Sequence, residues 1–180
     1  MKQSDKFGRR PWWRGPRTVA PAGSEEGGAL YEFAMVLPLL ATMLVAVIFG
    51  GITFFNYVEL ASAVESGGRT LANGRLEGTN ACSQANTAIT NSVGNLSSSQ
   101  VVTGTVTFAG SSSCSSILQQ YDTGVVSAVY PCNLPIPFTK FNLCPMANGV
   151  QITANFSGAP TLVSCPYAYC IGATTYVSIE

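Results

Sequence analysis

The longest apolar stretch of the chain lies near its N-terminus. The 26 residues from Phe33 to Val58 carry no charge, and a single carboxylate, Glu32, stands at the start of the run. A helix needs about 20 consecutive apolar residues to cross the hydrocarbon core of a bilayer. The pattern therefore predicts one transmembrane helix.

A helical pattern continues beyond the apolar run. Apolar and small residues recur at a spacing of three or four on one face: Tyr57, Leu60, Ala61, Val64, Gly68 and Leu71. Polar residues form the opposite stripe: Glu59, Ser62, Ser66, Arg69 and Asn73. This periodicity is typical of an amphipathic helix with one buried face. One helix from about Ala29 to Ala72 would be roughly 65 Å long, so half of it would stand outside the bilayer.

Three positions are expected to shape this helix. Pro38 removes a backbone donor within the span and predicts a kink. Gly67-Gly68 predicts a bend or a close contact, since two glycines weaken a helix by about 2 kcal/mol. Asn73-Gly74 is a natural helix stop. Glu65 and Arg69 are spaced as a favourable i, i+4 ion pair.

The composition changes after Asn73 to Ser, Thr, Gly, Asn and Pro. Apolar spacing over residues 81–96 predicts one more short helix, and alternation predicts strands at 105–108, 125–130, 150–156 and 175–179. Prolines predict a disulfide-pinned loop over Pro131 to Met146. The expected fold class is α+β, with a long N-terminal transmembrane and amphipathic helix followed by a small disulfide-braced antiparallel β-rich domain.

All six cysteines follow the span: Cys82, Cys114, Cys132, Cys144, Cys165 and Cys170. An even count confined to this part predicts an oxidising compartment and three disulfides. Fifteen pairings are possible, and proximity in the sequence favours Cys165–Cys170 and Cys132–Cys144. No C-x2-C pair is present, so disulfides are favoured over a zinc site, and no metal is expected.

The charges are distributed unevenly. Six of the nine bases precede the span, at Lys2, Lys6, Arg9, Arg10, Arg14 and Arg17. The positive-inside rule then predicts a cytoplasmic N-terminus and an exported C-terminal domain. A bacterial periplasm fits this topology. A eukaryotic type II membrane protein would fit as well, with Asn95 and Asn155 as glycosylation sites.

The chain offers little for catalysis. It has no His, and the exported part carries five acids, two of them on the polar face of the helix. Paired carboxylates, an activated thiol and a phosphate-binding loop are all without support. Positive charge outside the membrane is too sparse for nucleic acid. We expect a protein that is not an enzyme and binds no cofactor.

Two glycines, Gly27 and Gly28, precede the apolar run. If the chain began at Gly28, Glu32 and Phe33 would be its fifth and sixth residues. This G/XXXXEF pattern resembles the processing site of the TadE-like pseudopilins of the tight-adherence (Flp) pilus system. The resemblance continues through E-F-A-M-V-L-P-L-L (32–40), F-G-G (49–51) and F-F-N-Y-V-E-L-A-S-A-V-E-S-G-G-R (54–69). The C-terminal domain carries no motif that matches.

The resemblance implies that a prepilin peptidase of the bacterial inner membrane cuts after Gly27; a cut after Gly28 is an alternative. Residues 1–27 would then be a cytoplasmic leader, 28–73 a spine helix, and 74–180 a periplasmic domain. The spine would pack against other pilins, pseudopilins and the pilus assembly machinery. Glu32 would fix the register by neutralising a neighbouring subunit's amino group, because a buried unpaired charge penalises a wrong stagger. The size of the C-terminal domain favours a minor pseudopilin over a major pilin.

A second hypothesis is an uncleaved single-pass anchor whose exported domain binds a ligand at the cell surface. The Tyr-rich loop C-P-Y-A-Y-C, from Cys165 to Cys170, would then be the contact. A cleavable secretory signal is disfavoured, because the apolar run is too long and is followed by Tyr57, Glu59 and Leu60.

Overall fold

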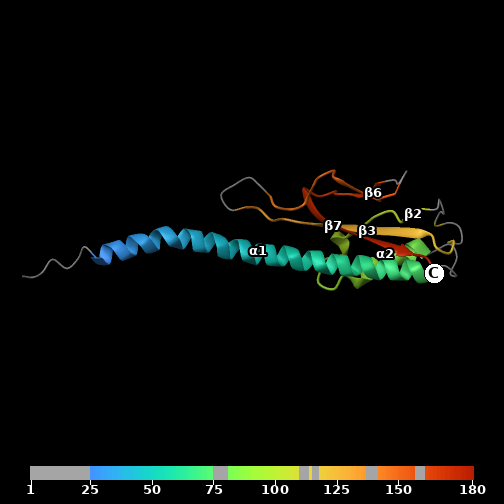
Figure 1. Ribbon diagram of the computed structural model, residues 1–180, viewed down its shortest axis with the longest axis horizontal. Coiled ribbons are helices and arrows are strands. Elements are labelled where there is room, and N and C mark those ends of the chain that lie inside the picture. Colours follow the sequence, from blue (N-terminus) through green and yellow to red (C-terminus); the bar gives the residue numbers. More distant parts are fainter. Residues whose placement is uncertain (1–24, 75–80, 110–113, 115–117, 137–141, 157–160) are drawn as a thin grey trace, which may run out of the picture. The chain divides into compact units, whose positions relative to one another are not determined.

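A computed structural model describes residues 25–74, 81–109, 114, 118–136, 142–156 and 161–180 of the chain (Figure 1). Residues 1–24 of the predicted leader lie outside the described part. Within these residues, the helices are α1 (Glu25–Asn73) and α2 (Ala81–Ser92), followed by a 3-10 turn at Ser98–Gln100. The strands are β1 (Val102–Thr103), β2 (Thr107–Phe108), β3 (Thr123–Pro131), β4 (Met146–Ala147), β5 (Gln151–Thr153), β6 (Thr161–Ser164) and β7 (Tyr169–Ser178).

The main sheet is built on one long antiparallel pair. Strands β3 and β7 are in register from Thr123 opposite Ser178 to Pro131 opposite Cys170. Both β1 and β2 pair with β3, and β4 pairs with β7, so the order is β1-β3-β7-β4 with β2 beside β3. A separate antiparallel ribbon is formed by β5 and β6.

Strand β3 is buried on both faces. Val126 and Ala128 pack with the helices in one core cluster, whereas Val125 packs with Leu162 and Ala154 in another. Successive side chains of a strand point to opposite faces. The domain therefore has three layers: the helices, the main sheet, and the β5–β6 ribbon.

The second half of α1 forms the helical side of the core. Leu60, Val64 and Leu71 are fully buried there, together with Ala85 and Ile89 of α2. The expected apolar stripe is confirmed in its outer part, while Tyr57 at its start remains 45% exposed. Fully burying a Leu or Val contributes about 1.5–3 kcal/mol, so this face holds the folded domain on α1.

The glycine pair of α1 is a close contact. A Cβ added at Gly67 would lie 2.5 Å from Ile89 Cγ1, and one added at Gly68 would lie 2.8 Å from Val177 Cγ1. Because glycine has no Cβ, the backbone of α1 can pack directly against these two side chains. The helix passes through the pair without interruption.

Most expected elements are present, with altered bounds. The helix begins at Glu25, before the expected start, and α2 ends at Ser92, with Val93 and Leu96 buried beyond it. Strands β3 and β7 are longer than predicted because each supplies the partner of the other.

The strand expected over 150–156 is wrong in length. Only Gln151–Thr153 is extended, and the register shifts between Ile152 and Thr153. Its partner β6 and the short β1 were not anticipated. Pro131 was expected in the loop but ends β3, where it lies opposite Cys170.

All six cysteines form disulfides, so the expected three bonds are confirmed. The pairs are Cys82–Cys114, Cys132–Cys144 and Cys165–Cys170. Both pairs favoured by proximity in the sequence are present. The two remaining cysteines, Cys82 and Cys114, form the third disulfide. The loop expected over Pro131 to Met146 is pinned by its disulfide, with residues 137–141 outside the described part.

Candidate functional site

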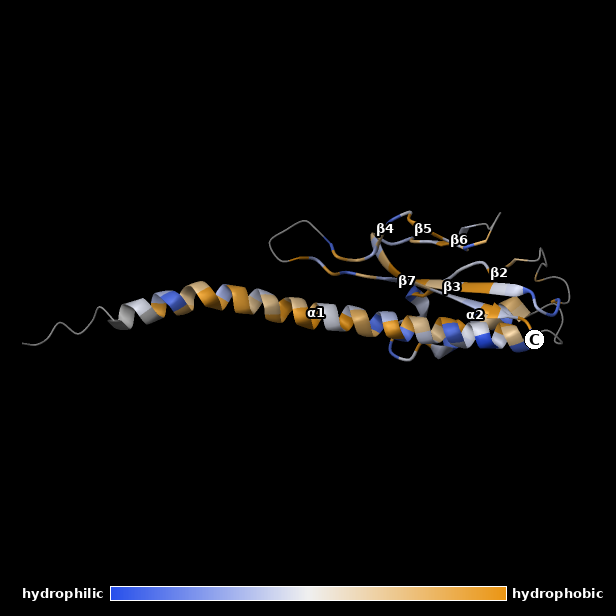
Figure 2. Ribbon diagram, in the orientation of Figure 1, coloured by the Kyte–Doolittle hydropathy of each residue, from blue (hydrophilic) through white to orange (hydrophobic). Residues whose placement is uncertain are grey.

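Large exposed apolar side chains are concentrated on the first half of α1. Of the 22 large hydrophobic residues that are exposed in the described chain, 18 lie between Leu30 and Val58. Leu30 and Val47 are each 74% exposed, whereas Leu60, two residues past this stretch, is fully buried. Figure 2 shows the change in hydropathy along α1. Monomeric soluble proteins rarely expose apolar patches of this size.

This surface has the length and composition of a membrane anchor. Among the described residues, one helical stretch, Leu30–Asn73, is long and apolar enough to cross a bilayer, and none of its most apolar window is buried. A helix satisfies all of its backbone hydrogen bonds internally, as hydrocarbon requires. One apolar N-terminal helix thus suits membrane anchoring.

The residues singled out for processing lie near the start of α1. Gly27 and Gly28 are both helical, and a Cβ added at Gly28 would meet no atom within 4 Å. Each glycine weakens a helix by about 1 kcal/mol relative to Ala. The peptide bond between Gly27 and Gly28 therefore lies in a helical turn that costs little free energy to unwind.

Glu32 and Phe33 are both exposed on α1, and Phe33 is 64% exposed. Within the described residues Glu32 forms no ion pair. Its role in setting the stagger between neighbouring subunit helices stays a prediction.

Pro38 lies inside α1. Because proline has no N–H, the carbonyl of Ala34 loses its usual partner. The helix continues on both sides, and the kink stays a prediction.

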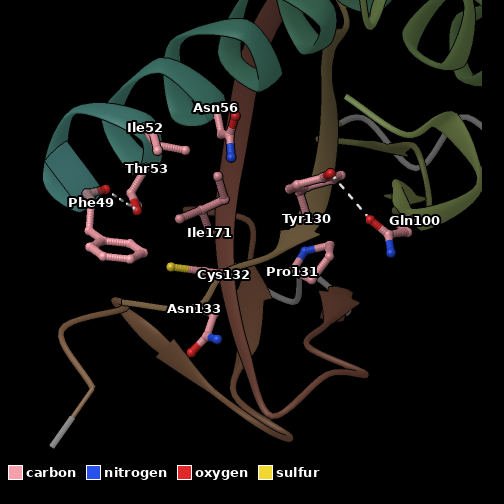
Figure 3. A pocket seen from close by; sticks show the side chains of 10 residues that line it. All are labelled: Phe49, Ile52, Thr53, Asn56, Gln100, Tyr130, Pro131, Cys132, Asn133 and Ile171. Carbon is pink, nitrogen blue, oxygen red and sulfur yellow. Dashed lines mark hydrogen bonds between the residues drawn. The ribbon is translucent and has the colours of Figure 1, made fainter. Parts of the chain in front are cut away.

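A groove of about 410 Å³ lies where α1 meets the end of the main sheet (Figure 3). One wall comes from α1, with Phe49, Ile52, Thr53 and Asn56. The other wall comes from Gln100, Ile171 and the segment Tyr130, Pro131, Cys132 and Asn133. Its lining is apolar toward Phe49 and Ile52 and carries three amide side chains, with no charged group.

Gln100 is fixed beside this groove. Tyr130 Oη donates a hydrogen bond of 3.2 Å to Gln100 Oε1, and Tyr167 Oη donates one of 3.1 Å to the Gln100 carbonyl. No sequence pattern marks this groove, apart from Asn56, an amide within the uncharged run.

Tyr167 and Tyr169, of the loop closed by Cys165–Cys170, are both half-buried. The Tyr167 hydroxyl is used within the domain, and Tyr169 begins β7. These contacts give the two tyrosines a packing role.

Glu59, on the polar stripe of α1, is only partly exposed. The backbone N–H of Asn95 donates a short hydrogen bond to Glu59 Oε1, and Glu59 Oε2 is buried. The carboxylate binds the turn that follows α2. Glu65 and Arg69 do form the expected exposed ion pair, at 2.6 Å.

One protein family matches the N-terminal region of the chain. Residues 27–69 match the family model of TadE-like proteins. The matched segment starts at the predicted cleavage site and ends within the buried half of α1. It covers 43 of the 180 residues, so it describes the helix and not the β-rich domain.

No curated protein and no solved structure matches the chain. The chain is thus similar to TadE-like proteins through α1, and its resemblance to that family, noted from the G/XXXXEF pattern, is confirmed over this segment. A TadE-like segment indicates involvement in the tight-adherence pilus.

Proposed function

We propose that this protein is a minor pseudopilin that acts in assembly of a tight-adherence (Flp-type) pilus. It is made as a precursor and cut after Gly27 by a prepilin peptidase. The mature protein is held in the bacterial inner membrane by α1, with its disulfide-braced domain in the periplasm. It then packs through α1 with other pilins or pseudopilins of the assembly machinery.

The observation that carries this proposal is the division of α1 into two halves. Leu30–Val58 is exposed and apolar, whereas the apolar face of Leu60–Leu71 is buried under the domain. An ordinary anchor ends at the membrane surface. Here the helix continues as part of the domain core, so a force applied to the apolar half is transmitted directly to the folded domain.

Glu32 supplies specificity in this mechanism. A carboxylate costs about 2.5–3.5 kcal/mol at the bilayer centre on insertion scales, and less at the entrance of the span, where Glu32 lies. Pairing with the amino group of a neighbouring processed subunit would offset this smaller cost. A wrong stagger leaves both charges unpaired. Helix packing alone, through small residues such as Gly50 and Gly51, is far less selective.

The protein acts by binding and not by catalysis in this account. All six cysteines are engaged in disulfides. Among the described residues, no three His, Cys, Asp or Glu side chains are grouped to hold a metal ion. The proposal includes no cofactor and no nucleic acid partner.

The direct test is deletion of the gene in its own host. The proposal predicts loss or strong reduction of surface pili, seen by electron microscopy, and recovery with a plasmid copy of the full chain. A copy in which the apolar half of α1 is replaced by an unrelated transmembrane helix should stay in the membrane and fail to restore pili. Normal piliation of the deletion strain would contradict the proposal and favour an uncleaved anchored binding protein.

A further inference from the structure

The groove beside α1 lies at the predicted edge of the membrane. About 20 helical residues cross the hydrocarbon core, and counting along α1 from Phe33, the first residue after Glu32, places the end of that crossing near Ile52. Phe49 and Ile52 form one wall of the groove. The opposite wall, Tyr130 to Asn133, belongs to the folded domain (Figure 3). The domain thus has a recess where lipid headgroups begin.

Strand β3 is directed toward this edge. Near its start, a Cβ added at Gly124 would lie 2.8 Å from Leu71 Cδ2, close to the end of α1. At its other end, Pro131 lines the groove with Phe49. The strand therefore runs antiparallel to the outer half of α1, and Cys132 and Asn133, which follow it, line the groove together with Phe49.

The chain after β3 forms a closed arm. We call residues 132–136 and 142–144 the exit arm, because they lie where α1 leaves the membrane. The Cys132–Cys144 disulfide closes its base, the N–H of Leu143 donates a 3.0 Å hydrogen bond to the Leu134 carbonyl, and Pro135 pairs with Asn142. These links hold its two sides antiparallel.

The described part of the exit arm exposes one large apolar side chain. Leu143 is 64% exposed, although a side chain of this size is usually covered in a folded domain. None of the described residues of the arm is Asp, Glu, Lys or Arg. One base, Lys140, belongs to the five residues between the two sides of the arm, outside the described part, and a basic side chain near a membrane surface is attracted to anionic lipid.

We propose that the exit arm rests in the interfacial region of the outer leaflet, with Leu143 inserted among the acyl chains and phospholipid occupying the groove. Phe49 and Ile52 face acyl chain, while the amides of Asn56, Gln100 and Asn133 offer N–H donors to lipid carbonyl and phosphate oxygens. The domain is then held against the membrane at two places, α1 and the arm, and does not swing freely on α1. This inference rests on the membrane anchoring of α1 under the proposed function.

Single tryptophans can locate each part of the protein relative to lipid. The chain contains two tryptophans, Trp12 and Trp13, both in the predicted leader. In a Trp12→Phe, Trp13→Phe background, one new tryptophan is introduced by Leu143→Trp in the exit arm, Leu44→Trp in the span, or Tyr121→Trp. Tyr121 is 79% exposed and lies beside Ile179, near the start of β3 and away from the groove.

Each full-length variant is reconstituted in vesicles of phosphatidylethanolamine and phosphatidylglycerol, with or without bromine on the acyl chains. Interfacial side chains penetrate about 5–10 Å, so bromines near the glycerol end should reduce emission of the Leu143→Trp variant about twofold. The Leu44→Trp variant should be quenched at least as strongly, and the Tyr121→Trp variant should not respond.

The controls separate the two proposals. Quenching of the Leu44→Trp variant without quenching of the Leu143→Trp variant would overturn the exit-arm inference and leave the anchor intact. That result would also arise if a neighbouring protein helix, and not lipid, covered the groove. Loss of quenching in the Leu44→Trp variant would overturn membrane anchoring itself.

Discussion

Gly67 of α1 lies against Ile89 of α2 so closely that an added Cβ would come within 2.5 Å of Ile89 Cγ1 and 3.0 Å of the Ala85 carbonyl oxygen. The second of these atoms belongs to the backbone of a helix and moves only if α2 moves. Gly67→Ala should therefore lower the free energy of unfolding by about 1–3 kcal/mol through overpacking. This loss outweighs the gain of about 1 kcal/mol in helix propensity.

The matched control for this change is Gly51→Ala, because Gly51 lies in the same helix with nothing within 4 Å of an added Cβ. Thermal or guanidinium unfolding of the detergent-solubilised protein should show the domain weakened by the first change and not by the second. Equal effects of the two substitutions would show that α2 does not pack on α1 at this glycine.

Glu59 should contribute to stability through hydrogen bonding to Asn95. Glu59→Ala removes the acceptor of the Asn95 N–H, and we expect a loss of about 0.5–1.5 kcal/mol, because Asn95 is exposed and water can take the place of the carboxylate. Glu59→Gln keeps an acceptor oxygen and should lose less. Glu65→Gln is the control, since its ion pair with Arg69 is exposed and worth about 0–1 kcal/mol. Denaturant midpoints that rank Glu65→Gln below Glu59→Ala would contradict this role.

The three disulfides should differ in their effect on stability according to the loops they close. The Cys82–Cys114 pair spans 32 positions, and the Cys165–Cys170 pair spans 5. Loop-closure entropy gives about 3–4 kcal/mol for the former and about 2 kcal/mol for the latter. Replacing both cysteines of one pair by Ala and measuring guanidinium unfolding should therefore lower the free energy of unfolding more for Cys82–Cys114 than for Cys165–Cys170. A larger loss for the short loop would show that packing of its two buried cysteines dominates.

Glu32 should matter for assembly and not for processing. In a strain that lacks the gene, a Glu32→Ala copy should be cut normally, seen as the same mobility shift as the wild type, yet restore few pili. The cause is loss of the partner for a neighbouring amino group. Glu65→Ala, which removes an acid outside the span, should restore pili fully. Normal piliation with Glu32→Ala would remove the register argument.

The features that the sequence predicted well depend on local pattern. The uncharged run after Glu32 and the amphipathic spacing up to Leu71 define α1, because both follow from helical periodicity. The pairings Cys132–Cys144 and Cys165–Cys170 join cysteines close in the chain, and these two fix the third pair. The TadE-like resemblance likewise lies within one continuous helix.

The features that were missed depend on contacts between distant segments. Glu59 looked like a solvent-facing acid, since nothing in its neighbourhood reveals that the turn at Asn95, 36 positions away, supplies a donor. The strand expected over 150–156 alternates well, yet its length is set by its partner β6, and the register shift after Ile152 ends the pairing. The groove joins α1 to Gln100 and to Tyr130, so no local motif marks it.

The measurement that tests the central claim most directly is the intact mass and N-terminal sequence of the protein extracted from membranes of its native host. The account predicts a chain that begins at Gly28, and a full-length precursor when the prepilin peptidase is deleted. A chain that still carries residues 1–27 in the wild-type strain would contradict processing and leave α1 as a permanent anchor.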